Sequence, residues 1–396
     1  MTNDGAGAPE RPFFVYAENW PGHDGIPTTG LDRALVPIVS AILPWQPTIL
    51  LAPRTLRHVR HTLHPVVKPI ARRASLLAIL LDELRTRRQR DYDGTGYAIR
   101  QLRAKIGAAR GILFSVLGGD ARAYVRAATL AQSSGLAHVI YTVDDPFAWA
   151  DERQAQLPLL QALKPRVTAA LGSASAVTAI TAGLAETLSA KSGRTCVPLA
   201  LPYMEPPALA DSIKRQLMYV GNMSHLYRDS FVQVIASVER RRAAGDDLTL
   251  RVTFPATALD GIIDHVPDFM EFGPINERQD LLTEIAESLA AVCPIAFDPA
   301  QDMVRTSFPS KMLDYLGNAR VIIVHGPIDS VAARYLSTNG LPYVTSSPVE
   351  LDRTIEAIMN DMPDHRDAYS AQLNRAHGGE AFRETLASAI RDGRGE

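Results

Sequence analysis

The sequence has little cysteine, no long apolar run and almost no net charge. Its two cysteines, Cys196 and Cys293, are too few and too far apart for a disulfide framework or a thiolate metal site, so we expect both to be small core residues. The first ten residues, MTNDGAGAPE, lack the basic start and apolar centre of a signal peptide, and no apolar run approaches the length of a membrane span. We therefore expect a cytoplasmic protein. With 46% hydrophobic and 21% charged residues, its composition is that of a globular protein.

The net charge of −2 hides an uneven distribution along the chain. Residues 51–110 hold fourteen Lys or Arg and only four Asp or Glu. Such a run is commonly a solvated helical face. It also fits a patch that rests on anionic lipid at the inner face of a membrane, helped by the apolar stretch 76–81, and both interpretations stay open. Nucleic acid is not expected as a partner, because the segment lacks interleaved aromatic residues and any recognisable binding module.

Short apolar runs alternate with longer segments of helical pattern, which is typical of a parallel α/β sheet. The first series of expected strands comprises residues 12–17, 48–52, 111–117, 137–143 and 177–181. The second series comprises residues 217–221, 248–254, 269–275, 291–297, 321–326 and 341–345. The sequence therefore predicts two Rossmann-like α/β domains that face each other across a cleft, with ligands at the carboxyl ends of the strands.

Prolines cluster between the two series and the regular periodicity stops there. We expect an N-terminal domain over residues 1–200, a linker over residues 201–216 and a second domain over residues 217–370. Residues 371–396 are expected to form a helical tail, and packing of this tail on the N-terminal domain is left open.

The stretch TSFPSKMLDYLGNARVIIVHGP, residues 306–327, places a lysine in the first turn of a short apolar helix. Ser307 is the expected N-cap and Gly317 the expected end of this helix. A cation in the first turn opposes the helix dipole, whereas helix N-termini are favourable sites for anions. A phosphate beside Ser310 and Lys311 would account for the lysine.

Two further features of the second series bear on that phosphate. In YVGNMSHLYRDSF, Gly221 permits close approach of the backbone to a ligand and Arg228 lies near the next helix start, although a plain turn with Asp229 as a cap is an equally simple explanation. Asp314 lies one helical turn after Lys311. It would either accept hydrogen bonds from ribose hydroxyls or form an ion pair with that lysine, and the spacing does not decide between them.

Polar residues also end strands of the first series. In IYTVDDPFAW, Asp144 and Asp145 follow a buried strand, where partial burial would raise the pKa of a general base. An Asx turn or helix cap is equally consistent, and a metal site lacks further ligands at suitable spacing. In WPGHDGIPTTGLDRAL, His23 is a reserve base, and Gly22, His23 and Asp24 are candidates for contact with an acceptor hydroxyl.

Taken together, these motifs resemble the GT-B glycosyltransferases. YVGN, EFGPI, CPIAFDP and SFPSKMLDYLGNARVIIVHGP resemble motifs of that family's C-terminal half, and TVDDPFAW with ALGSASAVTAITAGLAETL is similar to bacterial exopolysaccharide and glucuronosyltransferase-type members. The resemblance covers residues 13–358. It implies that the domain over residues 1–200 binds the acceptor and that the domain over residues 217–370 binds the nucleotide sugar. It also implies that Lys311 lies near the donor diphosphate, Asp314 near the ribose, and that Asp145 is the catalytic base. Retaining members carry a Glu where this chain has Thr306, so we expect inversion.

The resemblance and the residues together give a donor-binding set, which is Gly221, Asn222, Met223, Arg228, Gly273, Ile275, Phe297, Ser310, Lys311 and Asp314. They imply an enzyme that moves a sugar from a nucleotide-diphosphate sugar, expected to be UDP-linked, to a lipid-linked or polysaccharide acceptor. Neither a metal nor another cofactor is expected, because fixed cations would stabilise the leaving diphosphate. Two alternatives stay open: a nucleotide-sugar epimerase of the same fold, and a catalytically weak accessory subunit of a transferase complex.

Overall fold

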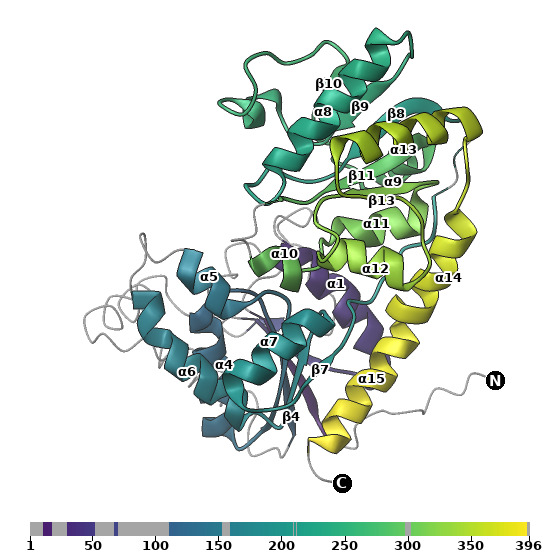
Figure 1. The fold of residues 1–396 in the computed structure, drawn as a ribbon. Helices are drawn as coiled ribbons and strands as arrows, with labels where there is room; N and C mark the ends of the chain where they lie inside the picture. Colours follow the sequence, from purple (N-terminus) through teal and green to yellow (C-terminus); the bar gives the residue numbers. More distant parts are fainter. Residues whose placement is uncertain are drawn as a thin grey trace, which may run out of the picture. The chain divides into compact units, whose positions relative to one another are not determined.

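Both series of expected strands form parallel sheets that alternate with helices, so the predicted α/β class is confirmed (Figure 1). The computed structural model describes residues 11–17, 30–51, 67–69, 111–152, 159–208, 210, 212–297 and 302–393. The chain divides into two units. Unit 1 consists of Met1–Met204 and His377–Glu396, and unit 2 consists of Glu205–Ala376.

The described part of unit 1 contains a seven-stranded sheet in the order β3-β2-β1-β4-β5-β6-β7, with all neighbours parallel. Its strands are β1 (Phe13–Ala17), β2 (Thr48–Leu51), β3 (Val67–Pro69), β4 (Ile112–Leu117), β5 (Ala137–Thr142), β6 (Ala176–Ala179) and β7 (Cys196–Pro198). Strands β1 and β4 are buried along their whole length, as is usual for central strands of a parallel sheet. The short strands β3 and β7 were not expected from the sequence.

Helices connect these strands, and several have their ends fixed by the residue types that favour helix caps. The described helices of unit 1 are α1 (Gly30–Ile42), η1 (Leu43–Trp45), α4 (Ala121–Ser134), α5 (Pro146–Glu152), α6 (Leu159–Ser173), α7 (Ala182–Ser192) and α15 (Gly379–Asp392). In α4, the Asp120 carboxylate accepts a hydrogen bond from the N–H of Arg122 (2.9 Å), and Gly135 ends the helix with a φ of 66°.

The last helix, α15, belongs to unit 1 although it lies at the end of the chain. It packs against α1 and β6, and Arg383 Nη1 donates a hydrogen bond to the carbonyl of Ala41 at 2.9 Å (Figure 1). The divisions between the units fall within the expected linker, residues 201–216, and within the expected tail, residues 371–396. The chain therefore passes from unit 1 to unit 2 and returns.

Unit 2 repeats the pattern with a six-stranded parallel sheet in the order β10-β9-β8-β11-β12-β13 within its described residues. The strands are β8 (Lys214–Tyr219), β9 (Thr249–Val252), β10 (Met270–Phe272), β11 (Ser288–Pro294), β12 (Ile322–His325) and β13 (Val344–Thr345). The helices are α8 (Arg228–Ala243), η3 (Ala256–Leu259), α9 (Arg278–Glu287), α10 (Asp302–Thr306), α11 (Lys311–Asn318), α12 (Val331–Thr338), α13 (Pro348–Asp361) and α14 (Arg366–His377). This strand order is that of a Rossmann fold.

An apolar core covers one face of the unit 2 sheet. Leu217 and Leu250 of the sheet pack with Phe231 of α8 and Ile355 of α13, and all four are fully buried. Elsewhere in the unit, α9 packs against β11 and α11. From β8 the chain adds β9 and β10 on one side of the sheet, and then β11, β12 and β13 on the other side. The carboxyl ends of β8 and β11 therefore form the switch point at which such sheets bind ligands.

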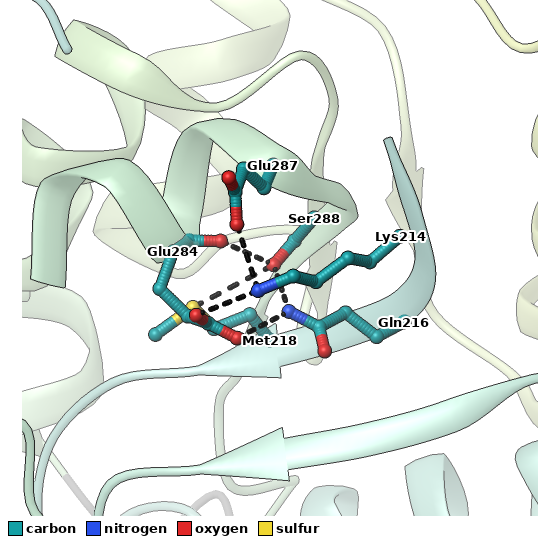
Figure 2. Close-up of polar contacts among 6 residues, drawn as sticks. All are labelled: Lys214, Gln216, Met218, Glu284, Glu287 and Ser288. Carbon is teal, nitrogen blue, oxygen red and sulfur yellow. Dashed lines mark hydrogen bonds and ion pairs between the residues drawn. The ribbon is translucent and has the colours of Figure 1, made fainter. Parts of the chain in front are cut away.

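A polar cluster lies at the opposite, amino-terminal edge of this sheet (Figure 2). Lys214 Nζ is 2.9 Å from Glu284 Oε2, and the buried side chain of Gln216 donates to Glu284 Oε1 (2.8 Å) and to Ser288 Oγ (2.9 Å). These polar side chains find their partners within the protein, which allows Lys214 and Gln216 to be part of a strand. Strand β8 therefore begins at Lys214, inside the segment expected to be a linker.

Candidate functional site

Beyond β8, the chain turns sharply at Gly221. Its φ of 115° is unfavourable for a residue with a side chain. The N–H of Gly221 donates to Thr253 Oγ1 (2.9 Å), and the N–H of Val220 donates to the hydroxyl of Tyr315 (2.8 Å). Because both of these amides are engaged within the protein, a ligand at this turn would depend on side chains for its charge contacts.

Helix α11 begins at Lys311, and all of its residues are buried. The expected N-cap at Ser307 is wrong. Ser310 occupies the N-cap position and makes no side-chain cap bond, while the N–H of Met312 closes the first turn by donating to the carbonyl of Pro309 at 2.8 Å. The later start leaves Lys311 as the first helical residue.

The far end of α11 also differs from the expectation. The helix passes through Gly317 and ends at Asn318, whose buried side chain donates to the carbonyl of Asp314 at 2.9 Å. The Tyr315 hydroxyl donates to the carbonyl of Val292 on β11 (3.3 Å) in addition to accepting the β8-side amide. Helix α11 is therefore fixed across the ends of β8 and β11, at the switch point.

Two tyrosine rings flank the ammonium group of Lys311. Its Nζ lies 4.0 Å from the ring centre of Tyr219, the last residue of β8, and 3.8 Å from that of Tyr227, which precedes α8. The same nitrogen is 3.8 Å from the position that a Cβ on Gly221 would take. Burial raises the pKa of the nearby Cys293 thiol to about 11, and the Lys311 charge acts against that rise. The structure thus brings together two predicted residues, Gly221 and the buried cation Lys311.

The carboxylate of Asp314 is held by Arg278, the first residue of α9. Arg278 Nη2 donates to Oδ1 at 2.5 Å and Nη1 donates to Oδ2 at 3.1 Å, in a two-pronged arrangement. Arg278 Nε also lies 3.6 Å from Glu205 Oε1. Asp314 is buried, while the Arg278 side chain is 41% exposed. The predicted ribose ligand is therefore already bound by a cation from a neighbouring helix.

The other predicted donor residues are spread along the carboxyl edge of the sheet. Asn222 is exposed and its carbonyl accepts a hydrogen bond from the Tyr219 hydroxyl (2.9 Å), whereas Met223 is half-buried against the core. Arg228 is the exposed first residue of α8. Between β10 and α9, Gly273 has a φ of 132° and is followed closely by the half-buried Ile275, two strands away from β8 in the sheet order.

Phe297 follows β11 and is fixed by its backbone. Its N–H donates to Asp229 Oδ2 (2.8 Å), and the other oxygen of Asp229 accepts the N–H of Ser230 (2.8 Å), so this acid joins the start of α8 to the loop after β11. The Phe297 ring makes a T-shaped contact with His325 of β12 at 5.3 Å. Burial lowers the pKa of His325 to about 4, and its Nε2 lies 3.0 Å from Gln233 Oε1. The lowered pKa keeps the His325 imidazole uncharged near neutral pH, and the contact with it fixes the Phe297 ring.

In unit 1, Asp145 caps helix α5. Its Oδ1 accepts the N–H of Phe147 (2.8 Å), and its Oδ2 lies 3.3 Å from Nζ of Lys191, in the last turn of α7. The Lys191 ammonium also lies 4.7 Å from the ring centre of Phe147. Asp145 is only 2% exposed, whereas the adjacent Asp144 is half-buried. Both oxygens of Asp145 are thus engaged, one by a helix and one by a cation.

The predicted acceptor contacts Gly22, His23 and Asp24 lie outside the described residues, as does almost all of the basic segment 51–110. Within the part of the chain that the structure describes, no group of three or more His, Cys, Asp or Glu is arranged to hold a metal ion. No helix in the described ranges is both long and apolar enough to cross a membrane. The expectation that Cys196 and Cys293 are buried, unpaired core residues is confirmed.

Sequence reasoning missed Arg278, Tyr219, Tyr227 and Lys191 as neighbours of the predicted site residues. Each is brought to its partner by the tertiary fold, since 36 residues separate Arg278 from Asp314 and 46 separate Lys191 from Asp145. The one signal within reach was the pair of tyrosines that brackets the Gly221 loop in YVGNMSHLY.

No family model matches the chain, and no curated protein sequence matches it. Solved structures do. Sucrose-phosphate synthase from Thermosynechococcus elongatus matches with a TM-score of 0.64 at 13% identity, over 96% of this chain and 99% of that one. The α,α-trehalose 6-phosphate synthase from Burkholderia multivorans matches with a TM-score of 0.62 at 12% identity, over 97% of each chain.

A third match is an α-glucosyltransferase in complex with UDP-glucose and DNA, with a TM-score of 0.55 at 11% identity, over 96% of this chain and 99% of that one. These neighbours are GT-B glycosyltransferases, so the predicted GT-B fold is confirmed. At these identities the likeness concerns the fold, and the activity has to be argued from the residues of the sites.

Proposed function

We propose that the protein is a glycosyltransferase that uses a nucleotide-diphosphate sugar, with the donor diphosphate bound at Lys311. The observation that carries this proposal is a buried lysine, 5% exposed, whose ammonium group lies at the sharp turn of Gly221 and which is the first residue of a helix at the sheet's switch point. Helix N-termini and fixed cations both favour phosphate. The GT-B fold of the neighbours, one of which is in complex with UDP-glucose, supports the same assignment.

The proposed chemistry is displacement at the anomeric carbon. An acceptor hydroxyl oxygen forms the new bond to that carbon, the bond to the diphosphate oxygen breaks, and the hydroxyl proton passes to a carboxylate of unit 1. Lys311 stabilises the charge that develops on the leaving diphosphate. The proposal includes no metal or other cofactor. Inversion is expected because Thr306 stands where retaining GT-B members carry a Glu.

We assign the base to the pair Asp144 and Asp145, with Asp144 as the more accessible member. Asp145 was the residue predicted from the sequence, but its two oxygens cap α5 and contact Lys191. To act as the base it would have to exchange the Lys191 contact for an acceptor hydroxyl. Asp144 is half-buried and follows the same strand, and its greater exposure favours it for contact with a substrate.

The remaining expectations belong to the same proposal. The nucleotide is UDP, and the acceptor is a lipid-linked or polysaccharide hydroxyl. The basic segment 51–110 would attract the protein to an anionic membrane surface at the cytoplasmic face, since each basic side chain near such a surface adds about 1 kcal/mol of attraction.

The test is an assay of UDP release from UDP-glucose and UDP-glucuronic acid, with and without a bacterial lipid extract as acceptor. We expect release that depends on the acceptor, that is lost in Lys311→Met, and that falls at least about a hundredfold in one of the variants Asp144→Asn and Asp145→Asn. Nuclear magnetic resonance of the product reports the anomer. Conversion of the sugar without any acceptor would replace this proposal with an epimerase.

A further inference from the structure

The two rings that flank Lys311 differ in how firmly they are held. Tyr219 is fully buried at the end of β8, where its ring packs against Phe231 (5.2 Å) and Phe254 (5.7 Å) between ring centres. Tyr227 is half-buried in the loop before α8, and its ring meets that of Tyr219 at 6.1 Å and 66°. The Tyr219 ring is therefore part of the core, whereas the Tyr227 ring belongs to the loop that follows Gly221.

An ammonium group within about 6 Å of an aromatic centre is attracted to the ring face. Lys311 satisfies that condition twice, at 4.0 Å and 3.8 Å. A free lysine side chain has many rotamers, and binding a phosphate would normally have to select one of them. Two ring faces on one ammonium group restrict those rotamers before any ligand arrives, which is preorganisation in the usual sense.

We propose that Tyr227, together with Tyr219, is a positioning residue that holds the Lys311 ammonium at the Gly221 turn for a nucleoside diphosphate. This inference rests on the proposed function, since it concerns the same donor site. It adds that the loop between Gly221 and α8 contributes to phosphate affinity through an aromatic face.

The chemistry separates this role from simple packing. Phenylalanine at position 227 keeps the ring face, whereas leucine keeps apolar volume and removes the face. Tyr343 offers a matched control, because it is also half-buried in unit 2 and packs against the ring of His365 at 5.5 Å. Tyr219 is left intact, since it is a core residue whose truncation would disturb the whole unit.

The experiment is calorimetric titration of the full chain with UDP, GDP, ADP and dTDP. For the diphosphate that binds the wild type most tightly, the affinity of each protein is then compared with its affinity for the parent nucleoside. The nucleoside affinity is measured by ligand-observed nuclear magnetic resonance. The proteins are the wild type, Tyr227→Phe, Tyr227→Leu, Tyr343→Leu and Lys311→Met. We expect Tyr227→Leu to bind the diphosphate about five- to tenfold more weakly, and Tyr227→Phe and Tyr343→Leu to stay within about twofold of the wild type. Affinity for the nucleoside should be equal in all five proteins.

Three outcomes would overturn the inference: unchanged diphosphate affinity in Tyr227→Leu, an equal loss in Tyr227→Phe, or a parallel loss of nucleoside affinity. The proposed function has its own readout. If Lys311→Met loses diphosphate binding while Tyr227→Leu does not, only the positioning role fails. If Lys311→Met binds as the wild type does, or none of the four diphosphates binds, the donor site at Lys311 is wrong and the positioning role falls with it.

Discussion

Arg278 holds both carboxylate oxygens of Asp314, at 2.5 Å and 3.1 Å, across 36 residues of sequence. The pair joins the first turn of α9 to α11, next to the switch point of the unit 2 sheet. A nucleotide whose ribose hydroxyls bind Asp314 would share that carboxylate with Arg278 or displace it. Under the proposed function, the ribose would therefore meet an ion pair at Asp314 and not a lone carboxylate.

The change Asp314→Asn is expected to weaken binding of UDP about tenfold, because hydrogen bonds to a charged acceptor contribute about 1.5–3 kcal/mol. Titration calorimetry measures the effect. Glu205→Gln is the matched control, since Glu205 is a second acid that contacts Arg278 and has no assigned contact with the donor. Unchanged UDP affinity in Asp314→Asn would remove this residue from the donor site.

Tyr315→Phe should lower the stability of unit 2. The variant leaves the buried N–H of Val220 without its acceptor, which costs about 1–3 kcal/mol, and removes the contact to the carbonyl of Val292. Urea unfolding measures the difference, and Tyr343→Phe is a control with a more exposed ring. Equal stability of the two variants would show that α11 is held to the sheet by packing alone.

Asp145 and Asp144 should differ sharply in their effect on folding. Asp145→Ala removes the cap of α5 and the partner of Lys191, and we expect a loss of about 1–2 kcal/mol from the cap alone. Asp144→Ala should cost less, because Asp144 is more exposed and the cap of α5 belongs to Asp145. Thermal unfolding distinguishes the two, and the reverse order would contradict the assignment of Asp145 as the capping residue.

His325 should make stability fall as the pH is lowered through the slightly acidic range. Burial lowers its pKa from 6.5 to about 4, so between these values the unfolded chain binds a proton that the folded chain does not. Stability is then complete above about pH 6.5, decreases toward pH 4 and is about 2 kcal/mol lower at pH 5 than at pH 7 from this group.

The comparison is between the wild type and His325→Gln, by urea unfolding at pH 7 and pH 5. The buried residues His138 and His377, with pKa values lowered to about 3 and about 4, contribute equally in both proteins and cancel in the difference. The variant should lose less stability on acidification than the wild type does. An identical loss in the two proteins would mean that His325 does not titrate in this way.

The sequence predicted each strand of four or more residues in the described ranges, apart from exact bounds, because each contains a run of apolar residues. It missed β3 (Val67–Pro69) and β7 (Cys196–Pro198), which are three residues long, include a proline and carry no run to detect. It began β8 too late, since Lys214 and Gln216 look like solvated residues until Glu284 and Ser288 are placed beside them (Figure 2).

The same limit applies to the candidate site. Gly221 and Lys311 were found from local signals, a glycine at a strand end and a lysine at the wrong end of a helix. Arg278, Tyr227 and Lys191 were not found, because their roles exist only through partners far away in the sequence. Local patterns identify residues that are unusual for their own element, whereas the groups that position them depend on tertiary contacts.

The most direct test of the account is a thermal-shift measurement with UDP, GDP, ADP and dTDP on the wild type, Lys311→Met and Lys214→Met. The two variants carry the same change at opposite edges of one sheet, and Lys214 belongs to the polar cluster of Figure 2. We predict that one diphosphate stabilises the wild type and Lys214→Met, by about 2.7 kcal/mol at a hundred times its dissociation constant, and that Lys311→Met loses most of this gain. Equal stabilisation of both variants, or none in the wild type, would contradict the donor site at Lys311.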